Sequence, residues 1–373
     1  MERKTPTYME FRNTDPIAML IRDKLNWSPR RYCFVILAIN LVIDLSLALY
    51  FRRFITSSGP PGLFQDPTTL LVDFVMMPVI GAYYIWSTAR IGPLLQDLYE
   101  SKVIPQDART EKIVQEFKQT LQSKNALAAS ILCSVFITVI MIGTFLSWYP
   151  WPSIRGFYSH ANIMIWLKSG MWLLTMYGLS FGLFNIATTV YFLRRIFRGH
   201  SINISPWHPD RCGGLKGISN YSMTLGYAIA VIGLTLSVQA IQEIRSGTFG
   251  SSYLTWLVLA MYILLSPMIF FLPLGTAHDA MRRAKKTHLL AISKQFDNHY
   301  KRITDTLSND NGEIASRVKR IEALQTLYKI TDDFTIWPFD VDNLRRFMTI
   351  TLAPLLPALV VIGFEIIKIL FLT

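Results

Sequence analysis

Hydrophobic and polar positions along the chain form long apolar runs separated by intervals rich in charge. Seven runs reach the roughly twenty residues that cross a hydrocarbon core of about 30 Å. They are Tyr32 to Phe51, Thr69 to Ala89, Leu127 to Tyr149, Asn162 to Leu193, Tyr221 to Ile241, Tyr253 to Leu274, and Phe347 to Leu372. The pattern predicts an all-α, polytopic membrane protein with seven transmembrane helices.

The N-terminal interval, residues 1–31, carries an amphipathic pattern. Asp15 and Pro16 form a helix-start signal, and Ile17, Ile21 and Leu25 follow on one helical face among basic residues. We expect this arm to lie on the inner membrane surface. The alternative is a helix packed on another cytoplasmic element.

Two further intervals predict cytoplasmic helices. Residues 90–126 contain one apolar stripe at helical spacing, centred on Phe117. Residues 275–346 contain two stripes, one from Leu289 to Leu307 and one from Ile314 to Tyr328, separated by the breaker Asn309 to Gly312. If the two predicted helices fold back on each other, each covers the apolar stripe of the other. The stripes predict either an intramolecular hairpin, or a cytoplasmic helical bundle that holds subunits together.

Charge gives the expected orientation. The net charge is +12, and the basic residues gather between the apolar runs, which indicates membrane topology and not nucleic-acid binding. An inner N-terminus places 31 Lys and Arg on the cytoplasmic side and 5 outside. We therefore expect cytoplasmic segments at 1–31, 90–126, 199–220 and 275–346. The membrane segments would be 32–89, 127–274 and 347–373, with the C-terminus outside.

Ionisable residues inside the runs are the main candidates for function, because a charge in hydrocarbon needs a partner or water. Asp44, Lys168 and Glu365 fall at similar depth in the outer third of their runs, and Asn40 lies one turn below Asp44. They predict either a hydrated ion pathway or a structural Asp44–Lys168 pair. Asp73 and Lys368 lie nearer the boundary, where we expect them to reach toward the headgroups.

The seventh run carries a helix break. Pro354 and Pro357 free backbone carbonyls in its inner half, and Thr351, Glu365 and Lys368 share one face with Pro354. This face suits a helix that lines a conduit. Ordinary packing of a kinked helix is the alternative.

The most motif-like stretch lies between the fourth and fifth runs. It contains His208, Asp210, Arg211, Gly213 and Gly214, which predict a glycine-dependent turn at the cytoplasmic mouth. His208 and Cys212 are weak candidates for metal ligands, because no second ligand pair lies nearby. We expect no metal here.

The sequence contains no Walker loop, dinucleotide fingerprint, nucleophile elbow or zinc-protease helix, so we expect neither an enzyme nor a cofactor. The element order resembles that of the insect chemoreceptor channels, whose last span lines an oligomeric pore. This resemblance covers element order only.

The leading hypothesis is an oligomeric ion channel or channel-like permeation protein, in which the seventh run lines the conduit. The alternatives are an ion-coupled secondary transporter and a non-conducting receptor or scaffold. The expected partners are the lipid bilayer, further copies of the chain and a small ion or solute, with no nucleic acid. The expected location is a plasma membrane or a bacterial inner membrane.

Overall fold

The computed structural model describes residues 15–105, 107–146, 156–199, 202, 204–205, 208–210, 212–247, 253–306, 311–338 and 345–349, and four single positions further on, 353, 356, 359 and 363. All regular structure within these residues is helical. The helices are α1 (Pro16–Ala18), η2 (Met19–Lys24), α2 (Pro29–Tyr50), η3 (Leu63–Gln65), α3 (Pro67–Leu71), η4 (Val72–Met76), α4 (Met77–Glu100), α5 (Ala108–Leu121), α6 (Lys124–Phe145), η5 (Phe157–His160), α7 (Asn162–Gly199), α8 (Lys216–Arg245), α9 (Tyr253–Thr306) and α10 (Asn311–Asp332).

Six helical stretches of the described residues are long and apolar enough to cross a membrane. They are α2, the continuous stretch from α3 through α4, and α6, α7, α8 and α9. The predicted all-helical class is therefore confirmed, and the six helices are compatible with the predicted multi-pass membrane protein. Most of the predicted seventh span lies outside the described residues. Its first turn is helical, and Phe347 stacks on Phe270 of α9.

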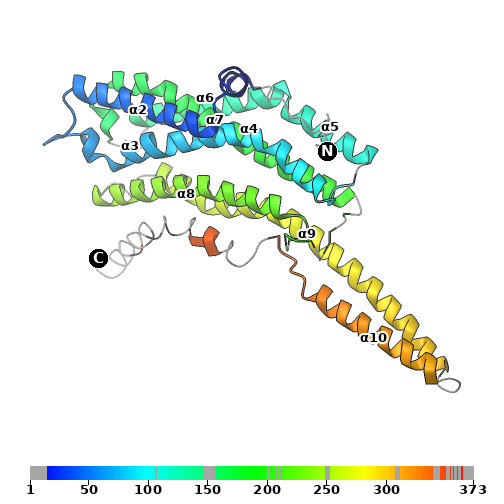
Figure 1. Ribbon diagram of the computed structural model, residues 1–373. Helices are drawn as coiled ribbons and strands as arrows, with labels where there is room; N and C mark the ends of the chain where they lie inside the picture. Colours follow the sequence, from blue (N-terminus) through cyan, green and yellow to red (C-terminus); the bar gives the residue numbers. More distant parts are fainter. Residues whose placement is uncertain are drawn as a thin grey trace.

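The helices run side by side along one axis (Figure 1). α4 and α7 contact each other at the centre. α2 packs against α4 and α6 against α7 on one side of this pair, whereas α8 and α9 pack against it on the other. We call the side from which α9 projects the inner side, and the opposite side the outer side.

The helices differ in length, and the difference falls on the inner side. α2 and α6 have 22 residues each, and α7 has 38. At about 1.5 Å per residue these lengths are about 33 Å and about 57 Å. The outer ends are tied together by polar contacts near Asp66, so α4, α7, α8 and α9 extend inward beyond α2 and α6. A bilayer matched to α2 would leave these inner ends in the aqueous phase.

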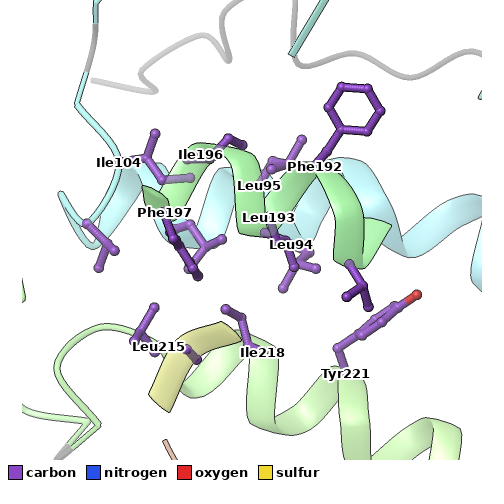
Figure 2. Packing of buried hydrophobic residues seen from close by; sticks show 14 of the residues in the cluster. Leu94, Leu95, Ile104, Phe192, Leu193, Ile196, Phe197, Leu215, Ile218 and Tyr221 are labelled. Carbon is purple, nitrogen blue, oxygen red and sulfur yellow. The ribbon is translucent and has the colours of Figure 1, made fainter. Parts of the chain in front are cut away.

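The inner extension has its own apolar core. Leu94 and Leu95 of α4, Leu193 and Phe197 of α7 and Ile218 of α8 are buried together, as Figure 2 shows. The amphipathic helix α5 covers this core from the side, and its Phe117 ring stacks on Phe192 with ring centroids 4.8 Å apart. The extension is therefore a packed part of the bundle.

Beyond this core, α9 continues away from the bundle on the inner side, and α10 folds back along it (Figure 1). Leu324 of α10 is buried, and Ile292, Phe296 and Ile303 of α9 are half-buried. Other apolar side chains of the hairpin remain exposed, among them Leu290, Tyr300, Val318, Leu327 and Ile330. The two stripes seen in the sequence thus lie on a helical hairpin, and part of the apolar surface of this hairpin is exposed.

The N-terminal arm differs from the expected surface helix. Ala18 and Ile21 are buried in a cluster with side chains of α2, α4 and α7, so one face packs on the bundle. Met19, Leu20 and Leu25 are exposed on the rest of the segment. The described part of the arm is therefore held by contacts with α2, α4 and α7.

A tight turn precedes α8. Gly213 and Gly214 both have positive φ, +65° and +91°, which side-chain-bearing residues rarely adopt. A Cβ on Gly214 would lie 2.5 Å from Cγ2 of Val103, so the turn also needs glycine for lack of space.

We predict that Gly214→Ala lowers the melting temperature more than Gly59→Ala does. Gly59 has a similar φ of +86°, but nothing lies within 4 Å of its Cβ position. Both variants adopt a left-handed conformation at a cost of about 1–2 kcal/mol, and only Gly214→Ala adds overpacking of about 1–3 kcal/mol. Thermal unfolding in detergent measures the difference. Equal melting temperatures would show that the contact with Val103 is unimportant.

Candidate functional site

Three charged side chains meet inside the outer half of the bundle. Asp44 of α2, Asp73 of η4 and Lys168 of α7 are each 0% exposed. The Lys168 Nζ atom lies 2.8 Å and 3.1 Å from the two Asp44 carboxylate oxygens, and 3.4 Å from Asp73 Oδ2. Asp44 and Lys168, which the sequence places at similar depth in their apolar runs, are thus in direct contact.

Tyr158 completes this cluster from outside the membrane-spanning helices. It belongs to η5, the short segment before α7, and its ring is buried. Its hydroxyl lies 2.6 Å from Asp44 Oδ1 and 2.5 Å from Asp73 Oδ2. The Lys168 Nζ atom is 5.6 Å from the centre of the Tyr158 ring, a distance that allows a cation–π interaction. We call Asp44, Asp73, Tyr158 and Lys168 the charged cluster.

The position of Tyr158 depends on Asp66, at the outer end of the bundle. Asp66 is buried and caps α3 by accepting a hydrogen bond from the Thr69 amide at 3.2 Å. The same carboxylate accepts hydrogen bonds from the Phe157 amide at 2.8 Å and from the Gln242 side chain at 3.3 Å. One carboxylate therefore ties η5 to α3 and α8 and holds Tyr158 inward.

Asp73 is placed by an irregular helix. η4 is a π-helical segment between α3 and α4, and such segments reorient side chains and are frequent at functional sites. The Asn40 side-chain amide donates a hydrogen bond to the Asp73 carbonyl at 2.9 Å. The expectation that Asp73 reaches toward the headgroups is therefore wrong, because its carboxylate points into the bundle beside Lys168.

The polar contacts of the cluster imply a bound proton. The Tyr158 hydroxyl has one hydrogen, yet two carboxylate oxygens lie within hydrogen-bonding distance of its oxygen. Both contacts are favourable only if one carboxyl group is protonated and donates to the phenol oxygen. The cluster then holds one ammonium, one carboxylate and one neutral acid, and its net charge is zero. Neutrality is strongly favoured for a site without water access.

Two acceptors beside the cluster have no donor within the described part of the chain. They are Asn40 Oδ1 and Asp73 Oδ1, both buried. Such acceptors are costly when left unsatisfied. A proton on Asp73 Oδ2 would leave Oδ1 as a neutral carbonyl oxygen, which costs less to bury without a donor than a carboxylate oxygen does.

The other predicted site residues divide into two groups. Thr351, Glu365 and Lys368 lie outside the described residues, as does Arg211. His208, Asp210, Cys212, Gly213 and Gly214 all lie in the turn before α8, on the inner side and far along the bundle from the charged cluster. Their role at a cytoplasmic mouth stays a prediction.

The Asp210 carboxylate organises that turn. It accepts hydrogen bonds from the amides of Cys212 at 2.9 Å, Gly214 at 3.0 Å and Lys216 at 3.3 Å, and His208 Nδ1 lies 2.7 Å from it. Burial raises the pKa of Asp210, but the amides of Gly214 and Cys212 outweigh burial, so its pKa is lowered overall. Within the described residues, no group of three or more His, Cys, Asp or Glu side chains is placed to hold a metal ion.

Comparison with known proteins gives no relative for this chain. No family model matches it, and no curated protein or solved structure gives a significant match. The resemblance to the insect chemoreceptor channels in element order therefore stays a prediction, and function is argued from the charged cluster.

We predict that Lys168→Met destabilises the protein by about 3–5 kcal/mol, because it leaves a buried carboxylate without its cation. Adding Asp44→Asn should recover part of this loss, with a coupling free energy of about 0.5–3 kcal/mol. Chemical unfolding of the two single variants and the double variant in detergent measures the coupling. As a control, Arg195→Met breaks the partly exposed pair with Glu116 and should cost less than about 1 kcal/mol. Additive effects of Lys168→Met and Asp44→Asn would contradict the pairing.

We also predict that the stabilising effect of Asp210 disappears in acid. A lowered pKa in the folded state means that the ionised carboxylate stabilises the fold above its ordinary value of 3.8. This stabilisation is lost as pH falls through the lowered pKa. Asp210→Asn should therefore cost about 1–2 kcal/mol near neutral pH and less in acid. Unfolding free energies at several pH values test this, with the exposed Asp297→Asn as control. A cost that is independent of pH would contradict the assignment.

Proposed function

We propose that this chain is a membrane transport protein in which the charged cluster binds and releases a proton during the transport of a solute or ion. The observation that carries the proposal is the Tyr158 hydroxyl between two buried carboxylates, which accounts for one proton held beside Lys168. An ionisable group inside a membrane bundle usually marks a transport pathway or a proton relay.

The proposed topology has seven spans, an inner N-terminus and an outer C-terminus. The excess of Lys and Arg in alternate intervals supports this orientation. With this topology the inner side defined above is cytoplasmic, and the α9–α10 hairpin projects into the cytoplasm. The charged cluster then lies closer to the external surface, beneath η5.

The chemistry of the cluster suggests how proton release would be coupled to movement. With one proton bound, the cluster is neutral and can stay sealed between α2, α4 and α7. Loss of that proton leaves two carboxylates and one ammonium, a net charge of −1, in a place without water. That charge favours a conformation that admits water or a cationic group to the site. Transport would follow if the two conformations open to different sides.

A second candidate is the oligomeric ion channel. It is favoured by the exposed apolar side chains of the α9–α10 hairpin, such as Leu290, Tyr300 and Val318, which offer a surface for another copy of the chain. In this proposal the seventh span lines the conduit, and the charged cluster is a structural tie.

We predict that pH-driven uptake requires the charged cluster. Proteoliposomes with purified protein would be placed in a mixture of small metabolites and salts under an inward proton gradient, and their contents analysed by mass spectrometry. Wild-type protein should accumulate at least one solute, and a protonophore should abolish the accumulation. Asp73→Asn should lower the initial rate by at least about tenfold, equivalent to about 1.4 kcal/mol in the barrier.

The exposed Asp297→Asn variant serves as control and should transport like the wild type. Each variant would first be shown to be folded by size-exclusion chromatography. Flux that continues without a proton gradient and is unchanged by Asp73→Asn would favour the channel. The absence of any accumulation or flux from folded protein would contradict both proposals and leave a receptor or scaffold.

A further inference from the structure

A further buried carboxyl group lies toward the inner side of α2, α4 and α7. Asp15, directly before α1, is 3% exposed. Its Oδ1 atom accepts a hydrogen bond from the Tyr177 hydroxyl of α7 at 2.6 Å and one from the Ile17 amide at 3.2 Å. Its Oδ2 atom is buried and accepts no hydrogen bond within the described residues. One of the two carboxylate oxygens, Oδ2, therefore lacks a hydrogen-bond donor among the described residues when Asp15 is ionised.

The burial of Asp15 depends on how the N-terminal segment docks. Ala18 and Ile21, one turn and nearly two turns later, are buried against side chains of α2, α4 and α7. In this docked position the Asp15 carboxyl group lies against Tyr177, so release of the segment would return it to water.

Among the described residues, the groups that face Asp15 are uncharged. Tyr177 of α7 donates a hydrogen bond to it, Tyr32 of α2 is buried in the same cluster as Tyr177, and the Tyr84 ring of α4 lies against Tyr177 with ring centroids 5.8 Å apart. No Lys, Arg or His among the described residues forms an ion pair with Asp15. Burying an unpaired carboxylate is unfavourable, whereas a neutral acid can be buried at much lower cost.

We propose that Asp15 is a second proton-binding site, whose protonation latches the N-terminal segment onto the bundle. The ligand is a proton taken from the inner aqueous phase. The latch does not depend on the proposed transport activity. It would act on the same bundle, because Tyr177 and Lys168 both belong to α7.

The direction of the pH effect follows from burial. Burial raises the pKa of Asp15, and the hydrogen bonds from Tyr177 and Ile17 only partly oppose this increase. The docked segment thus binds a proton more tightly than the released segment, whose carboxyl is in water. Docking is strongest in acid and weakens as pH rises from the ordinary carboxyl value through the raised pKa. Acidification on the inner side should close the latch.

The test is a distance measurement across the bundle. Spin labels would be attached to cysteines that replace two exposed residues, Met19 of η2 and Leu264 of α9, after Cys33, Cys133 and Cys212 are changed to serine. Pulsed electron paramagnetic resonance in lipid nanodiscs would then compare the lowest pH at which the protein stays folded with about pH 8, where an ordinary carboxyl group is ionised. We expect one narrow distance in acid and a broader, longer distribution at the higher pH.

Three further variants separate Asp15 from other titrating groups. Asp15→Asn, which is neutral at every pH, should keep the narrow distance at both pH values. Tyr177→Phe removes a donor to the carboxylate and should increase the released fraction at the higher pH. Asp23→Asn changes an exposed carboxylate of the same segment and should behave like the parent. A parent distribution that does not change with pH, or an Asp15→Asn variant that responds to pH like the parent, would overturn the proposal.

Discussion

The contact of Lys168 with Asp44 and Asp73 is the constraint on which the outer half of the bundle depends. Each of these side chains is completely buried, and none could remain ionised there without the others. Because they come from α7, α2 and η4, their pairing fixes the register of three helices. Apolar helix faces in a membrane would otherwise slide at little cost. The charged cluster therefore specifies the arrangement more than it adds to stability.

The two halves of the bundle are held in different ways. On the outer side, Asp66 connects α3, η5 and α8 through hydrogen bonds, and this network keeps Tyr158 over the charged cluster. On the inner side, the extended ends of α4, α7 and α8 are joined by an apolar core covered by α5. The outer half has a buried apolar cluster as well, which includes Leu47, Ile142 and Trp172, so the polar network there adds to apolar packing.

The sequence predicted what depends on local pattern and missed what depends on distant contacts. Apolar runs identified the six described membrane helices, and matched depth suggested the Asp44–Lys168 pair. Tyr158 was missed, because its segment lies between runs and is turned inward by contacts with residues far away in the sequence, such as Asp66. Asp73 was misplaced because a π-helical segment changes the side-chain direction that regular periodicity predicts. A tyrosine and a histidine just before a membrane run were the only sequence signal for η5.

Carboxyl groups at three places in the described residues are shielded from water to different degrees and with different partners, and the comparison shows where a proton should matter. Asp210 is surrounded by amide donors, which hold it ionised. Asp44 has the Lys168 ammonium and shares a hydroxyl with Asp73, so the pair needs one proton for two carboxyls. Asp15 has one hydroxyl, one amide and no cation among the described residues. Proton dependence should therefore be weakest in the turn before α8, intermediate in the shared cluster, and most direct at the N-terminal segment, where a single proton decides whether burial is favourable.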